Sequence, residues 1–211
     1  RDQPRGRILK DEAIDEIGVL VEYFGRLKFL GRLYLSEFSV SGKGRLAIDP
    51  RTEKQEWGGI TRFTWNPGHR SLQDGVIHAH TAEDADAWTG NGYLRDVTVT
   101  ADLTPLAGKS HLVVARVQGT SRFYAAGFQD GEAVILREDH GTTVLARAPF
   151  TLKPGEAHKL ALTVVGDKLA LAIDGKEVVT ATDGQFRYGQ AGLRMASAGR
   201  MTVARLEVVE I

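Results

Sequence analysis

The sequence predicts an all-β protein, in which most of the chain forms an antiparallel sandwich of two sheets. From Tyr93 onward, apolar and polar residues alternate in short segments, as in YLRDVTVTADL, where Val97, Val99 and Leu103 fall on one face. These segments recur at regular spacing and are divided by Gly, Asp and Pro. None of them has the apolar stripe of an amphipathic helix, so the pattern favours a sandwich over alternating strands and helices.

Short turn signals join many of the predicted strands. Gly119-Thr-Ser and Gly141 each divide two apolar segments, and Gly166-Asp167 and Asp174-Gly175 are two-residue hairpin signals. The strands predicted after Tyr93 are 93–103, 111–118, 122–128, 133–139, 142–148, 158–165, 168–173, 176–181, 190–195 and 201–209.

The segment before Tyr93 is less regular. ITRFTW (60–65) and GVIHAHTA (75–82) are predicted to be strands, separated by a turn at Asn66-Pro67-Gly68. Residues 83–92 are polar and rich in Gly, which predicts a loop.

An internal similarity gives the predicted domain organisation. GRLYLSEFSV (31–40) lines up with GRMTVARLEV (199–208), and each follows a Gly-apolar segment. Residues 1–42 are therefore predicted to be the closing strands of an upstream sandwich-like repeat or a linker, and residues 43–211 the sandwich. The alternative is that two β-hairpins share this pattern by chance. A true repeat would dock on the sandwich or leave a strand edge open to self-association.

Composition excludes some classes of partner and chemistry. Lys and Arg together number 27, as do Asp and Glu, so no net charge steers the chain toward nucleic acid or an anionic membrane. The apolar runs are too short for a transmembrane helix. Without cysteine there is no disulfide and no thiolate chemistry. The chain starts without Met or an apolar signal region, so we expect a piece of a longer protein whose localisation cannot be inferred.

Several segments resemble a known superfamily. They resemble concanavalin A-like domains of the laminin-G and 3-keto-disaccharide-hydrolase-like types, which implies a jelly-roll sandwich. The segments that carry this resemblance are VVARVQGTSRFYAAGF, HKLALTVVGDKLALAIDGKEV, GQAGLRM and the final VVEI. More narrowly, GYLRDVTVTADLTPLAG followed by ARVQGTSRFYAAGF resembles the C-terminal β regions of bacterial ADP-ribosylglycohydrolase (ADP-ribosylation/crystallin J1) proteins. GRLYLSEFSVSG resembles the linker strand that precedes such a domain in them. That resemblance implies an accessory domain beside a separate helical hydrolase domain, whose catalytic residues have no counterpart in this chain.

No catalytic pattern is recognisable in the sequence. The superfamily also contains β-glucanases, which carry E-x-D-x-x-E on one strand face, and the string nearest to it, around Asp15, has the wrong spacing. No G-x-S-x-G, Walker A or dinucleotide fingerprint occurs. The chain is thus predicted to be a non-catalytic, carbohydrate-binding-like accessory domain. The alternatives are a structural or oligomerisation domain and, by fold analogy alone, a sugar hydrolase of the 3-keto-disaccharide-hydrolase-like type.

The best binding candidates lie on two adjacent predicted strands. Arg116 and Gln118 share a strand face with apolar residues, and Arg122 and Tyr124 share a face on the next strand. Arginine can bind vicinal hydroxyls, carboxylate or phosphate with two parallel bonds, and tyrosine can stack on a sugar. The structural alternative is a sheet surface with a paired arginine and a packed tyrosine.

Tryptophans beside Gly-rich turns are further candidates. Trp65 and Trp88 could stack on a carbohydrate, as could Trp57, although tryptophan more often serves packing. The partners expected from these residues are a carbohydrate or an ADP-ribose-like ligand, other domains of the parent chain, and a second copy of the chain.

Metal ligands are sparse. His78 and His80 lie on one strand face, with Glu83, Asp84 and Asp86 just beyond, but no third ligand is fixed by spacing, so no metal site is predicted. No cofactor is predicted either. Calcium is the ion that acidic loops at Asp49, or at Asp130 and Glu132, could hold, although neither is a dense ligand loop.

Overall fold

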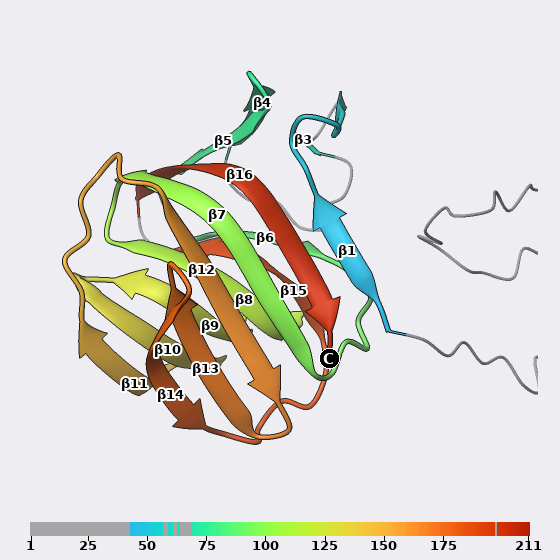
Figure 1. Ribbon diagram of the computed structural model, residues 1–211, viewed down its shortest axis with the longest axis vertical. Coiled ribbons are helices and arrows are strands. Elements are labelled where there is room, and N and C mark those ends of the chain that lie inside the picture. The colour runs from blue at the N-terminus through green and yellow to red at the C-terminus, as the bar shows by residue number, and fades with distance from the viewer. Residues whose placement is uncertain (1–42, 57–58, 61–62, 64–68, 197) are drawn as a thin grey trace, which may run out of the picture. The chain divides into compact units, whose positions relative to one another are not determined.

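The computed structural model describes residues 43–56, 59–60, 63, 69–196 and 198–211, and these form strands, turns and loops only. No helix among them is long and apolar enough to cross a membrane. Two antiparallel sheets pack face to face and enclose one core (Figure 1). The predicted all-β, two-sheet sandwich is confirmed.

The larger sheet has the order β14-β13-β12-β7-β16-β5-β4, and β1 also pairs with β16. Its strands are β1 (Arg45–Ile48), β4 (His69–Gln73), β5 (Val76–Thr81), β7 (Val97–Ala107), β12 (His158–Val165), β13 (Lys168–Ile173), β14 (Lys176–Thr182) and β16 (Gly199–Glu210). Alternation along β7 places Val97, Val99, Ala101 and Leu103 in the core, as the sequence pattern predicts.

The smaller sheet has the order β11-β10-β9-β8-β15-β6. Its strands are β6 (Ala85–Thr89), β8 (Ser110–Gly119), β9 (Arg122–Gln129), β10 (Glu132–Asp139), β11 (Thr142–Pro149) and β15 (Gln190–Met195). A separate ribbon pairs β2 (Gln55–Glu56) with β3 (Gly59–Ile60).

The predicted hairpins lie where the turn residues place them. Asp174 and Gly175 join β13 to β14 with φ of 52° and 81°, the left-handed pair that a type I′ turn requires. Gly166, with φ of 58°, begins the turn between β12 and β13. Asp130 and Gly131 form a further hairpin turn, between β9 and β10, which was not among the predicted turns.

Part of the segment predicted to be a loop is a strand. β6 lies within residues 83–92 and is buried along its whole length, so it shows no alternation between apolar and polar residues. Two short strands, β1 and β4, were also not predicted. Most of the predicted strand 60–65, the turn 66–68 and the whole of the predicted segment 1–42 lie outside the described residues.

The inner strands of the smaller sheet, β8, β9 and β10, are buried on both faces. The inner face of this sheet contributes to the main core, and its outer face carries a second apolar cluster. Both faces of β8, β9 and β10 are thus apolar, which explains runs such as HLVVARV and FYAAGF. The second cluster consists of Trp88, Leu112, Val114, Val117, Phe123, Ala125, Val134 and Leu136.

Candidate binding site

Arg116 is a buried side chain at the end of β8. Only 1% of its surface is exposed, whereas the strand pattern predicted that it projects from the sheet beside Val114. The prediction fails because Arg116 has a φ of 53° and lies in a bulge, where the pairing of β8 with β9 passes from Ala115 to Gly119. The bulge breaks the alternation and turns the guanidinium into the protein.

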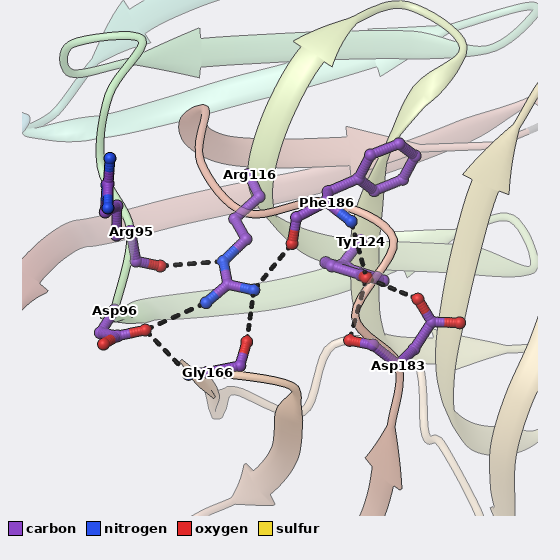
Figure 2. Close-up of polar contacts among 7 residues, drawn as sticks. All are labelled: Arg95, Asp96, Arg116, Tyr124, Gly166, Asp183 and Phe186. Carbon is purple, nitrogen blue, oxygen red and sulfur yellow. Dashed lines mark hydrogen bonds and ion pairs between the residues drawn. The ribbon is translucent and has the colours of Figure 1, made fainter.

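The Arg116 guanidinium connects three loops at one end of the sandwich (Figure 2). Its Nε donates to the carbonyl of Arg95 at 2.9 Å, and Nη1 donates to the carbonyls of Gly166 and Phe186 at 2.7 and 2.8 Å. Its Nη2 lies 3.1 Å from the Asp96 carboxylate, which also accepts the backbone N–H of Gly166. All three guanidinium nitrogens of Arg116 donate to groups of the protein itself, so Arg116 positions loops and is not available to a ligand.

Tyr124 is also buried, and its hydroxyl lies within the same end of the sandwich. The hydroxyl is 2.6 Å from Asp183 Oδ1, to which it donates its single proton, and it accepts the N–H of Phe186 at 3.1 Å. Burial raises the pKa of Tyr124 to about 12, and the hydrogen bond to Asp183 adds to the effect. The predicted sheet-surface role of Tyr124 is therefore wrong, because its ring packs edge-on against Phe186 in the core.

The remaining two candidates contact the same loop. Arg122 is partly exposed, places its guanidinium 5.3 Å above the Phe186 ring and lies 3.6 Å from Asp139. Gln118 is exposed, and its Nε2 donates to the carbonyl of Tyr188 at 3.0 Å. All four side chains selected from the sequence thus converge on one segment, residues 183–189, which we call the β14–β15 loop.

Asp183 is the first residue of the β14–β15 loop, and its carboxylate holds the start of the loop in place. Burial raises the pKa of this carboxyl, but the hydrogen bond from Tyr124, the N–H of Gln185 and the Arg137 guanidinium at 2.5 Å outweigh burial. The pKa of Asp183 therefore lies below its ordinary value.

We expect the stabilising effect of Asp183 to disappear in acid. Its folded-state pKa lies below its unfolded value of about 4, so its contribution is complete above that pH and is lost as the pH falls through the folded-state pKa. Asp183→Asn keeps an acceptor for Tyr124 but does not titrate. Urea unfolding at a series of pH values should show the stability difference between wild type and this variant shrinking below about pH 4. A difference that is constant with pH would contradict the assignment.

The loops that Arg116 connects carry two exposed tyrosines. Tyr93 is 79% exposed and Tyr188 is 43% exposed, and their rings are inclined by 29° to each other, with centroids 6.1 Å apart. Neither residue was a candidate from the sequence. Tyr93 opens the predicted strand 93–103, but β7 begins only at Val97, and Tyr188 is an isolated aromatic in a loop. The available signal was the glycine beside each tyrosine, in Gly92-Tyr93 and Tyr188-Gly189, which is typical of a loop.

Close backbone packing joins the two tyrosine loops. Gly189 donates its N–H to the carbonyl of Leu94 at 3.0 Å, which links the β14–β15 loop to residues 90–96, the β6–β7 loop. A Cβ on Gly189 would lie 2.3 Å from the carbonyl carbon of Arg116 and 2.5 Å from the backbone of Val117. Gly189 also has a φ of +153°, so both space and backbone conformation require glycine here.

The tryptophan candidates lie elsewhere. Trp88 is only 7% exposed and belongs to the outer apolar cluster of the smaller sheet, which agrees with the packing interpretation. Trp65 and Trp57 lie outside the described residues.

The acids that follow His78 and His80 in the sequence bind other side chains. Asp84 and Asp86 both bind the Arg194 guanidinium, at 2.6 and 2.8 Å, and His80 packs against the ring of His69. Among the described residues, no group of three or more His, Asp or Glu side chains is arranged to hold a metal ion.

No known protein family's sequence model matches this chain, and no curated protein matches it by sequence. Solved structures do match its fold. The carbohydrate binding module CBM66 from Bacillus subtilis is 18% identical with a TM-score of 0.61, over 68% of this chain and 94% of that one.

Two further neighbours have the same sandwich. The exoplasmic/lumenal domain of VIP36, in a Ca²⁺/Man3GlcNAc-bound form, is 12% identical with a TM-score of 0.55, over 69% of this chain and 82% of that one. A putative glycosyl hydrolase from Parabacteroides distasonis is 12% identical with a TM-score of 0.52, over 72% and 89%. At these identities the likeness concerns architecture, and it shows that the chain is a β-sandwich of the concanavalin A-like fold.

Proposed function

We propose that this chain is a non-catalytic sugar-binding domain whose ligand lies on Tyr93 and Tyr188. The observation that supports this proposal most strongly is the pair of exposed, stacked tyrosine rings on loops that a buried arginine connects. Exposed aromatics held in fixed positions are costly to leave in water, and their faces pack well against the C–H groups of a sugar ring.

The spacing of the rings limits how a sugar can bind. A sugar between the two rings would need about 7–8 Å, because carbon atoms in contact are 3.5–4.0 Å apart on each side. The centroids are 6.1 Å apart, so the ligand would lie on the outer face of Tyr93 and along the edge of Tyr188. Gln118, whose amide already contacts the Tyr188 carbonyl, would supply a polar group beside the rings.

The comparisons agree with this proposal at the level of fold. One neighbour is named a carbohydrate binding module and another was solved with a mannose-containing saccharide. A rigid sandwich with binding residues on its end loops is a common arrangement for recognition, because the loops can vary while the sheets hold them.

Tyr93→Ala is expected to weaken saccharide binding about tenfold and to leave stability unchanged within about 0.5 kcal/mol, because the ring is largely in solvent. Tyr188→Ala should have a similar effect on binding. A glycan array followed by calorimetric titration of the best ligand measures both.

Val144→Ala is the matched control, since Val144 is an exposed apolar residue on the edge strand β11. The proposal is wrong if no saccharide binds the wild type. It is also wrong if the tyrosine variants bind as tightly as the control.

The proposal also concerns the longer protein to which this domain would belong. The resemblance of GYLRDVTVTADLTPLAG to β regions of ADP-ribosylglycohydrolase proteins supports an accessory role beside a glycohydrolase domain, with a carbohydrate or ADP-ribose-like ligand. Sequencing the complete gene tests it. A helical hydrolase domain encoded in the same chain is expected, and a gene that encodes no such domain would contradict the accessory role.

A further inference from the structure

We infer that the sugar bound at Tyr93 and Tyr188 carries an anionic group, and that Arg95 and Arg187 bind that group. This inference rests on the proposed sugar-binding function and names the class of ligand. Arg95 is two residues after Tyr93 and Arg187 immediately precedes Tyr188, and both arginines are exposed.

Arg95 and Arg187 differ from most described arginines because neither has a carboxylate partner. Most described arginines have a carboxylate oxygen within 4.0 Å: Arg45, Arg51, Arg116, Arg122, Arg137, Arg147, Arg194 and Arg205. Within the described part of the chain, Arg95, Arg187 and Arg200 have no such partner. Two of these three lie beside the exposed tyrosines, so positive charge without an internal counter-ion collects at that end of the sandwich.

Two acids on or beside these loops, Asp96 and Asp183, are already engaged by other groups. Asp96 binds the Arg116 guanidinium and the N–H of Gly166, and Asp183 binds Tyr124 and Arg137. Asp167, on the neighbouring turn, lies close to Arg187, since both would contact a Cβ on Gly184, but the two form no ion pair within 4.0 Å. Asp167 is exposed and is followed directly by Lys168, so that turn adds no net charge.

Internal hydrogen bonds hold the backbone at both arginines, and the Arg187 guanidinium lies beside Gly184 of the same loop, where an added Cβ would be 3.2 Å from its Nη2. The carbonyl of Arg95 accepts from Arg116, while the Arg95 side chain points away from that contact (Figure 2). Arg187 is fixed through its neighbours, because the carbonyls of Phe186 and Tyr188 accept from Arg116 and Gln118. A planar guanidinium binds carboxylate or phosphate through two parallel hydrogen bonds, and its hydrogen bonds to neutral hydroxyls are weaker.

The test is calorimetric titration of the full chain with three probes: a galacturonate oligosaccharide, ADP-ribose and a neutral galactose oligosaccharide. We expect at least one anionic probe to bind about tenfold more tightly than the neutral one. The carboxylate and phosphate probes identify the source of the anion. High salt should reduce this preference, because the charges are exposed.

Arg95→Gln and Arg187→Gln should each weaken the anionic complex about fivefold and leave the neutral one unchanged. Arg200→Gln is the matched control, because Arg200 is also exposed and unpaired but lies opposite Ala107, at the far end of β7. Equal affinity for anionic and neutral probes, or equal behaviour of the three variants, overturns the inference and leaves the sugar-binding function standing. Binding of no probe, charged or neutral, overturns both.

Discussion

Replacing Arg116 with Met is expected to lower the free energy of unfolding by about 3 kcal/mol or more. The substitution keeps the apolar length of the side chain but removes the donors that satisfy the carbonyls of Arg95, Gly166 and Phe186. Each carbonyl left without a partner costs about 1–3 kcal/mol, reduced where water can enter. For a chain of this size the melting temperature should fall by about 6–12 °C.

Arg200→Met is the control for Arg116→Met, since it removes an exposed guanidinium from β16 and should change stability by less than about 0.5 kcal/mol. Arg116→Lys should be intermediate, because one ammonium cannot reach three diverging carbonyls and Asp96 together. If Arg116→Met is as stable as Arg200→Met in urea unfolding, Arg116 does not hold the loops together.

Gly189→Ala is expected to have the second large effect, a loss of about 3 kcal/mol with displacement of the β14–β15 loop. The added methyl group would overlap the backbone of Arg116 and Val117, which cannot move without breaking β8. Sugar binding should fall with the displacement, because Tyr188 is the preceding residue.

Gly141→Ala separates steric overlap from backbone strain. Gly141 has a φ of +156°, close to the +153° of Gly189, but a Cβ there would meet nothing within 4 Å. Its substitution should cost about 1 kcal/mol from conformation alone. Equal losses for the two variants would show that the close approach at Gly189 contributes nothing.

The two-sheet fold could be predicted from the sequence because its determinants are local. The alternation of Val97, Val99 and Leu103, and the turns at Gly166 and Asp174-Gly175, each act within a few residues. β6 could not be predicted, because a strand buried on both faces has no alternation, and its Asp86 is accommodated by an ion pair with Arg194 from a strand far along the chain.

The candidate site could be predicted only in part. The sequence drew attention to residues 116–124 because arginine and tyrosine interrupt apolar strands there. Their orientation could not be inferred, since it depends on one bulge with a positive φ at Arg116. Tyr93 and Tyr188 were missed because the contact between them is made by two loops distant in sequence.

The central claim is that a saccharide binds on the two tyrosine loops that Arg116 connects. Heteronuclear NMR titration of the chain with its best saccharide ligand tests it most directly. We predict chemical-shift changes concentrated in the β6–β7 loop, at Gln118 and in the β14–β15 loop, and lost in Tyr93→Ala. Changes centred instead on the outer face of the smaller sheet, around Trp88 and Ala125, with the tyrosine loops unaffected, would contradict it.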